Sequence, residues 1–157
     1  MGTATRSTTA FAQVIYEYTL AHTGRDFARW MGTLATDRRA RVDGWEMHLV
    51  HGSPLGVNDF WWESLPEDEH RRRVAASGAD VILCTHSGLP WQRRVGTTLV
   101  VNVGVLGRPA NDGRQEVWYC LLDVDQAGVS AQLVPTSVQR PSRRASPSWC
   151  WCSTVRR

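Results

Sequence analysis

Apolar residues recur at helical spacing along the first 35 residues of the chain. The period of one helix face, i, i+3, i+4 and i+7, relates Phe11, Val14, Ile15 and Tyr18. After a break at Gly24, the same spacing relates Phe27, Trp30, Met31 and Leu34. The pattern predicts a helical hairpin over residues 11–35. Residues 1–10 are rich in threonine and are expected to be disordered.

Shorter apolar runs dominate the rest of the chain and predict strands. Asp43-Gly44 is a hairpin-turn signal between residues 40–42 and 45–50. Further strands are expected at residues 81–84, 92–95, 98–103, 117–124 and 129–134.

One helix is expected among these strands, over residues 66–77. Ser64 is expected to cap it, Pro66 suits its first turn, and Gly78 ends it. Its arginine run, residues 71–73, and His70 are expected on the solvated face.

Composition is typical of one globular domain. The chain has 157 residues, of which 42% are apolar and 21% charged. No run approaches the roughly 18 to 20 apolar residues that a membrane span needs. The first ten residues lack the apolar core of a signal peptide, so a cytoplasmic location is expected. Among the four cysteines, Cys84 and Cys120 lie in apolar runs and are expected to be buried thiols.

The net charge of +3 comes from an arginine excess near the C-terminus. Residues 139–157 are rich in Arg, Ser and Pro without periodicity, and are expected to form a disordered basic tail. Such a tail can contact nucleic-acid phosphates. It lacks the interleaved aromatic and glycine residues of nucleic-acid-binding segments, so we favour a solvated tail.

Two loops carry the candidate chemistry. His51-Gly52-Ser53-Pro54 follows the strand at 45–50, and Thr85-His86-Ser87-Gly88-Leu89-Pro90 follows the strand at 81–84. Ligands in α/β sheets bind at the ends of strands, and an imidazole there can bind a metal, transfer a proton or only fill space. His48 alternates with apolar residues and is expected to be structural.

Further motifs follow these loops in a fixed order. Residues 58–64 read Asn-Asp-Phe-Trp-Trp-Glu-Ser, Asn102-Val103-Gly104 follows, and a proline-containing loop at 107–113 precedes Trp118-Tyr119. Together with the histidine loops, this order resembles the calcineurin-like metallophosphoesterase superfamily. The likeness is greatest to bacterial metallophosphatases of the single-domain phosphodiesterase type, over roughly residues 12–138 of an expected domain at residues 11–138.

The resemblance implies an α/β fold. It would be the mostly β second half of a four-layer αββα sandwich, preceded by the helical hairpin. It implies hydrolysis of phosphomonoesters or phosphodiesters by a water activated on divalent metals such as manganese, iron or zinc. By resemblance, His51 and His86 bind the same metal ion, and Asn58, Glu63 and Asn102 lie nearby and shape the site.

The chain also departs from the family pattern. The Asp-x-His, Gly-Asp and Gly-Asn motifs are absent from residues 1–50, and Gly88 stands in place of a second loop histidine. We therefore expect the chain to be the C-terminal portion of such an enzyme, of doubtful activity alone. A mononuclear site of His51, His86 and a further acid is one possibility. A non-catalytic remnant or self-associating interaction module is the alternative, because uncovered sheet edges and faces associate.

Overall fold

The structure is a computed structural model that describes residues 4–106 and 114–137. The chain divides into two compact units, residues 1–36 and 37–157. The expected basic tail at 139–157 and the proline-containing loop at 107–113 lie outside the described residues.

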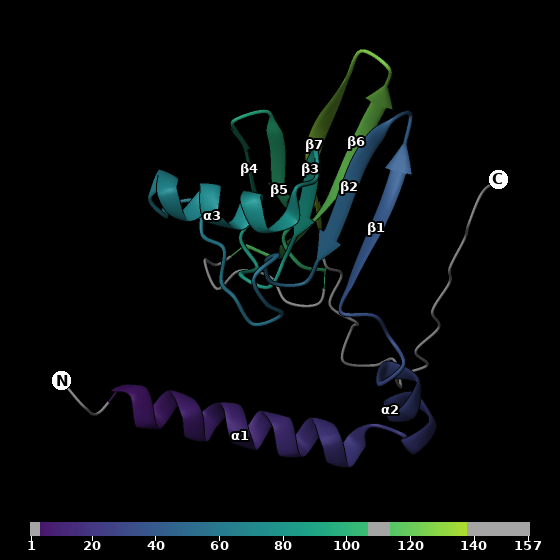
Figure 1. The fold of residues 1–157 in the computed structure, drawn as a ribbon. Helices are drawn as coiled ribbons and strands as arrows, with labels where there is room; N and C mark the ends of the chain where they lie inside the picture. Colours follow the sequence, from purple (N-terminus) through teal and green to yellow (C-terminus); the bar gives the residue numbers. More distant parts are fainter. Residues whose placement is uncertain (1–3, 107–113, 138–157) are drawn as a thin grey trace. The chain divides into compact units, whose positions relative to one another are not determined.

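The first unit consists of two helices, α1 (Ala4–His22) and α2 (Arg25–Met31), separated near Gly24 as the apolar spacing predicts (Figure 1). Helix α1 begins earlier than expected: residues 4–10 are helical, because this stretch contains no glycine or proline to interrupt the backbone ladder. Apolar side chains of the predicted faces are exposed where the structure describes them, including Val14, Tyr18 and Trp30. Within the described residues, no helix combines the length and apolar character that crossing a membrane requires.

The second unit is built on a mixed five-stranded sheet. Its strands are β1 (Asp37–Val42), β2 (Trp45–Val50), β3 (Val81–Cys84), β4 (Trp91–Val95) and β5 (Thr98–Asn102), in the order β1-β2-β3-β5-β4. The central strands β2, β3 and β5 are parallel, whereas β1 and β4 pair antiparallel at the two edges. The predicted turn at Asp43-Gly44 is confirmed, with φ of 47° and 92° at the two residues.

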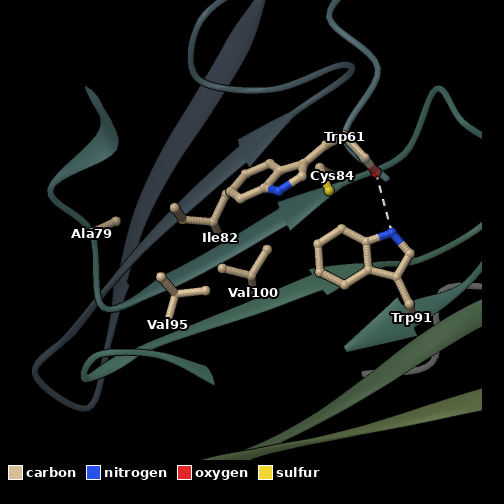
Figure 2. Close-up of a cluster of buried hydrophobic side chains, with 7 residues drawn as sticks. All are labelled: Trp61, Ala79, Ile82, Cys84, Trp91, Val95 and Val100. Carbon is tan, nitrogen blue, oxygen red and sulfur yellow. Dashed lines mark hydrogen bonds between the residues drawn. The ribbon is translucent and has the colours of Figure 1, made fainter. Parts of the chain in front are cut away.

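Helix α3 (Glu67–Ser77) makes the crossover from β2 to β3, and buried side chains fill the space between it and one face of the sheet. Figure 2 shows the cluster, in which the Trp91 Nε1–H donates a hydrogen bond of 3.2 Å to the Trp61 carbonyl. The cluster consists of Trp61, Ala79, Ile82, Cys84, Trp91, Val95 and Val100. Burial raises the pKa of the Cys84 thiol to about 12, as expected for a buried cysteine.

Three expectations for α3 need correction. Ser64 does not cap the helix: Pro66 occupies the position before it, and no side chain makes a cap hydrogen bond. His70 is fully buried instead of solvated, because its ring accepts the Trp61 Nε1–H at 2.9 Å. Arg73 is also buried, unlike its neighbours Arg71 and Arg72. Gly78 ends the helix as predicted, with φ of 67°.

A second, two-stranded antiparallel sheet covers the other face. It consists of β6 (Glu116–Asp125) and β7 (Gly128–Ser137). Val129 joins Met47, Val81, Leu99 and Val101 in the apolar cluster between the two sheets. The unit therefore has helix, sheet and sheet in succession, which confirms the expected α/β class.

Candidate metal centre

The parallel strands bring the two histidine loops to one edge of the sheet. Register pairs Leu49 of β2 with Leu83 of β3, and Cys84 of β3 with Asn102 of β5, so the three strands end side by side. His51 is the first residue after β2, and His86 is the second after β3. A backbone hydrogen bond of 3.0 Å from Thr85 N–H to the His51 carbonyl joins the loops. The topology thus places both imidazoles where α/β sheets bind ligands.

The two imidazole rings meet edge to face, with an interplanar angle of 65°. His86 Nδ1 lies 3.0 Å from His51 Nε2, and the ring centroids are 4.9 Å apart. At this distance one nitrogen carries the proton and the other accepts it. Burial, and secondarily the neighbouring His86, lower the pKa of His51 below its ordinary value of 6.5. His51 is therefore neutral at pH 7, the form in which imidazole binds metals.

The loop that carries His86 is held in an uncommon conformation. The φ of His86 is 59°, a left-handed value that costs a residue with a side chain about 1–2 kcal/mol. Asn102, which is fully buried, braces this loop on both sides of His86. Its Nδ2 donates to the Thr85 carbonyl at 3.0 Å and to Ser87 Oγ at 2.8 Å, and its Oδ1 accepts the Gly104 N–H at 3.1 Å.

The loop that carries His51 is closed by backbone contacts. A Cβ added at Gly52 would lie 2.5 Å from the carbonyl oxygens of Gly56 and Val57, so only glycine fits. Ser53 and Gly56 exchange two backbone hydrogen bonds of 3.0 Å each. The Ser53 hydroxyl donates in turn to the Asp59 carboxylate.

An ion pair anchors this loop to helix α3. Arg73 donates from Nε to Asp59 Oδ2 at 2.9 Å and from a second nitrogen to Oδ1 at 3.0 Å. It also donates to the Glu69 carboxylate at 2.6 Å. We refer to Ser53, Asp59 and Arg73 as the loop anchor. Sequence reasoning missed it, although the buried α3 residues His70, Arg73 and Ser77 follow the period of a helix face.

Asn58 is exposed, and within the described part of the chain no hydrogen bond or ring contact joins it or Glu63 to His51 or His86. Glu63 instead lines a neighbouring cavity of about 820 Å³. Its carbonyl accepts the His70 Nε2–H at 3.2 Å.

The histidine pair fits two positions of a metal coordination sphere. Two imidazole nitrogens on one tetrahedral zinc, each about 2.0–2.1 Å from it, lie about 3.3 Å apart, close to the 3.0 Å between His51 and His86. His86 Nε2 is buried without a hydrogen-bond partner. The described residues contain no group of three or more His, Cys, Asp or Glu that could hold a metal.

Comparison with known proteins assigns the class. The family model of the calcineurin-like phosphoesterase superfamily domain matches residues 17–127. The chain belongs to this superfamily, as its motifs indicate. No curated protein matches it.

Two solved structures share the fold. A hypothetical protein from Pyrococcus horikoshii OT3 has a TM-score of 0.65 and 15% identity, over 78% of this chain and 48% of that one. A metallophosphoesterase from Sphaerobacter thermophilus has a TM-score of 0.57 and 16% identity, over 75% of this chain and 55% of that one. The chain thus spans about half the length of these two proteins.

Proposed function

We propose that this chain supplies two imidazole ligands, His51 and His86, to a metal centre that hydrolyses phosphoester bonds. The convergence of the two rings at the shared edge of three parallel strands carries the proposal. Membership of the calcineurin-like phosphoesterase superfamily supports phosphoesters as the substrate class. Manganese, iron and zinc are the metals that suit mixed imidazole and carboxylate ligands.

The chain's own residues would prepare the site for the metal. A bound divalent metal lowers the pKa of a coordinated water and polarises the phosphate. His51 is neutral at pH 7 and keeps a lone pair for coordination. Asn102 holds the His86 loop, and Phe60 lies 4.3 Å from the His86 ring, between ring centroids, and shields one side of it. The loop anchor fixes the backbone that carries His51.

Metal binding tests the proposal directly. We expect the purified chain to bind zinc or manganese in isothermal titration calorimetry, and the affinity to fall at least about tenfold in His51→Ala and His86→Ala, since loss of even an indirect partner of a ligand costs that much. His22→Ala is the matched control, because His22 is an exposed helix residue. Equal affinities in His51→Ala and His22→Ala would refute the proposal.

Turnover is a separate measurement. Bis-p-nitrophenyl phosphate hydrolysis with manganese, abolished in His51→Ala, would support catalysis by the chain alone. Metal binding without turnover would show that further ligands are required, in agreement with the lack of a third acidic or imidazole group beside the pair in the described residues.

A non-catalytic, self-associating module is the second candidate. Leu121 and Tyr119 of β6 are exposed, as are Val14 of α1 and Trp30 of α2. The exposed edge strand β1 carries Arg38, Arg39 and Arg41, which disfavour edge-to-edge pairing. Association would therefore use apolar side chains. We expect light scattering after size exclusion to show a dimer or larger species, which Leu121→Lys reduces; a monomer would exclude this candidate.

A further inference from the structure

A cavity of about 820 Å³ lies beside the loop that carries His86. It is formed by the segment after Trp61, the Gly88-Leu89-Pro90 segment that follows His86, and residues of β6 and β7. Its volume is within the range of small-molecule sites. Three tryptophans line it, Trp62, Trp91 and Trp118.

The wall favours a flat, uncharged group. Besides the three indoles, Leu89, Val105 and Leu133 line the cavity. Among the described residues, its charged lining consists of Glu63, Glu116 and Arg114, and Arg114 Nη1 lies 3.7 Å from Glu116 Oε2. Two carboxylates with one guanidinium disfavour a further anionic group such as a polyphosphate. Indole faces stack well on planar rings, irrespective of the identity of the ring.

The indoles are held in place before any ligand binds. Trp91 is nearly fully buried, and its hydrogen bond to the Trp61 carbonyl fixes the ring (Figure 2). Trp118 packs against Gly104, where an added Cβ would lie 2.9 Å from the Trp118 Cβ. Trp62 is about one-third exposed and stacks on Phe60, with centroids 5.3 Å apart. A rigid wall lowers the entropy cost of binding.

Aromatic contacts connect the cavity to the histidine pair. Phe60 stacks on Trp62 on one side and lies 4.3 Å from the His86 ring on the other. The cavity therefore begins one aromatic ring away from His86. A phosphoester held at the imidazoles could place its leaving group against Trp62.

We propose that this cavity binds a planar, uncharged aromatic ring, the leaving group of the phosphoester substrate. The role as leaving group rests on the proposed function, whereas binding of the ring does not. A nucleobase and a simple aryl group share this chemistry. Phosphate-free ligands distinguish them: adenosine and benzyl alcohol carry the two ring types, and ribose carries neither.

Binding is measured on the full chain without metal, by ligand-observed saturation-transfer NMR. We expect saturable binding of adenosine, benzyl alcohol or both, and none of ribose. Trp62→Ala should weaken the binding about tenfold, the size of one stacking interaction. Trp30→Ala is the matched control, because Trp30 is an exposed indole of α2. Leu133→Trp, which fills the cavity, should also weaken the binding.

The proposal would be overturned if neither adenosine nor benzyl alcohol shows saturable binding. Equal affinities in Trp62→Ala and Trp30→Ala would overturn it as well, provided that circular dichroism shows both variants folded. If Trp62→Ala does not fold, the comparison of Leu133→Trp with Trp30→Ala decides. Because the measurement contains no metal, its result does not depend on whether His51 and His86 bind a metal. If neither aromatic ligand binds, the proposal for the cavity is refuted even if the metal centre is active.

Discussion

Replacing Arg73 tests whether the loop anchor stabilises the fold. Arg73→Met keeps most of the side-chain volume and its packing near Trp61, whose ring centroid lies 6.0 Å from the guanidinium carbon. The substitution removes both hydrogen bonds to Asp59 and those to Glu69. It therefore separates the polar contacts of Arg73 from its apolar packing.

The expected loss is about 3 kcal/mol of unfolding free energy. Breaking a buried ion pair costs about 3–5 kcal/mol, because the remaining charge keeps its desolvation penalty. The Arg73 side chain is 6% exposed and that of Asp59 is 27% exposed, so water can partly solvate the carboxylate left behind. The Ser53 hydroxyl also still donates to it. Both effects place the cost at the lower end of that range.

The pH dependence provides an independent check. Burial alone would raise the pKa of Asp59, but the Ser53 hydroxyl and the Arg73 guanidinium outweigh it and lower the pKa below the ordinary value of 3.8. A carboxyl group with a lowered folded-state pKa stabilises the fold above its unfolded pKa, and this contribution is lost as pH falls through the folded pKa. The difference between wild type and Arg73→Met should therefore shrink below about pH 4.

Urea unfolding followed by circular dichroism at pH 7 and pH 3 measures both effects. Arg72→Met is the matched control, since Arg72 lies on the exposed side of α3 and forms one surface ion pair with Glu69. The reasoning fails if Arg73→Met is no more destabilising than Arg72→Met at pH 7. It also fails if the cost of Arg73→Met is the same at both values of pH.

Three further predictions concern single positions. Gly52→Ala should destabilise the fold by more than the ordinary Gly-to-Ala change, since the new Cβ would overlap two backbone carbonyls; Gly56→Ala, which meets no atom within 4 Å, is its control in urea unfolding. Burial lowers the pKa of His70, so stability should fall as pH drops below 6.5, and this slope should be smaller in His70→Gln; an unchanged slope would contradict the argument. Cys84 should resist iodoacetamide at pH 8 in the native state and react in urea, as peptide mass spectrometry would show; native labelling would contradict the burial that raises its pKa.

Local sequence signals predicted the elements well where one period or one turn type decides the structure. The Asp43-Gly44 turn and the helix end at Gly78 are examples, because each depends on a left-handed backbone that few residues adopt. The meeting of His51 and His86 could also be foreseen, since parallel strands end at the same edge of a sheet.

The loop anchor and the burial of His70 could not be foreseen in the same way. A run of three arginines in the sequence predicts solvated side chains. Arg73 is buried because it pairs with Asp59, 14 residues away, and this tertiary contact has no local signal. His70 is buried because the Trp61 indole donates to it, and this pairing depends on how the loop before α3 folds back. Contacts between a loop and a helix produce no regular spacing of apolar or polar residues, so the sequence pattern cannot predict them.

At His86, the left-handed backbone lowers the stability of the fold, whereas the imidazole at the same position is proposed to bind the metal. Glycine adopts a φ of 59° without the steric penalty that histidine incurs, so the fold alone would favour glycine there. The advantage of histidine at this position is therefore its imidazole ring, which contacts His51 and Phe60 and is proposed to bind the metal. Selection of variants for thermal stability alone would therefore be expected to replace His86, whereas selection for metal binding would retain it.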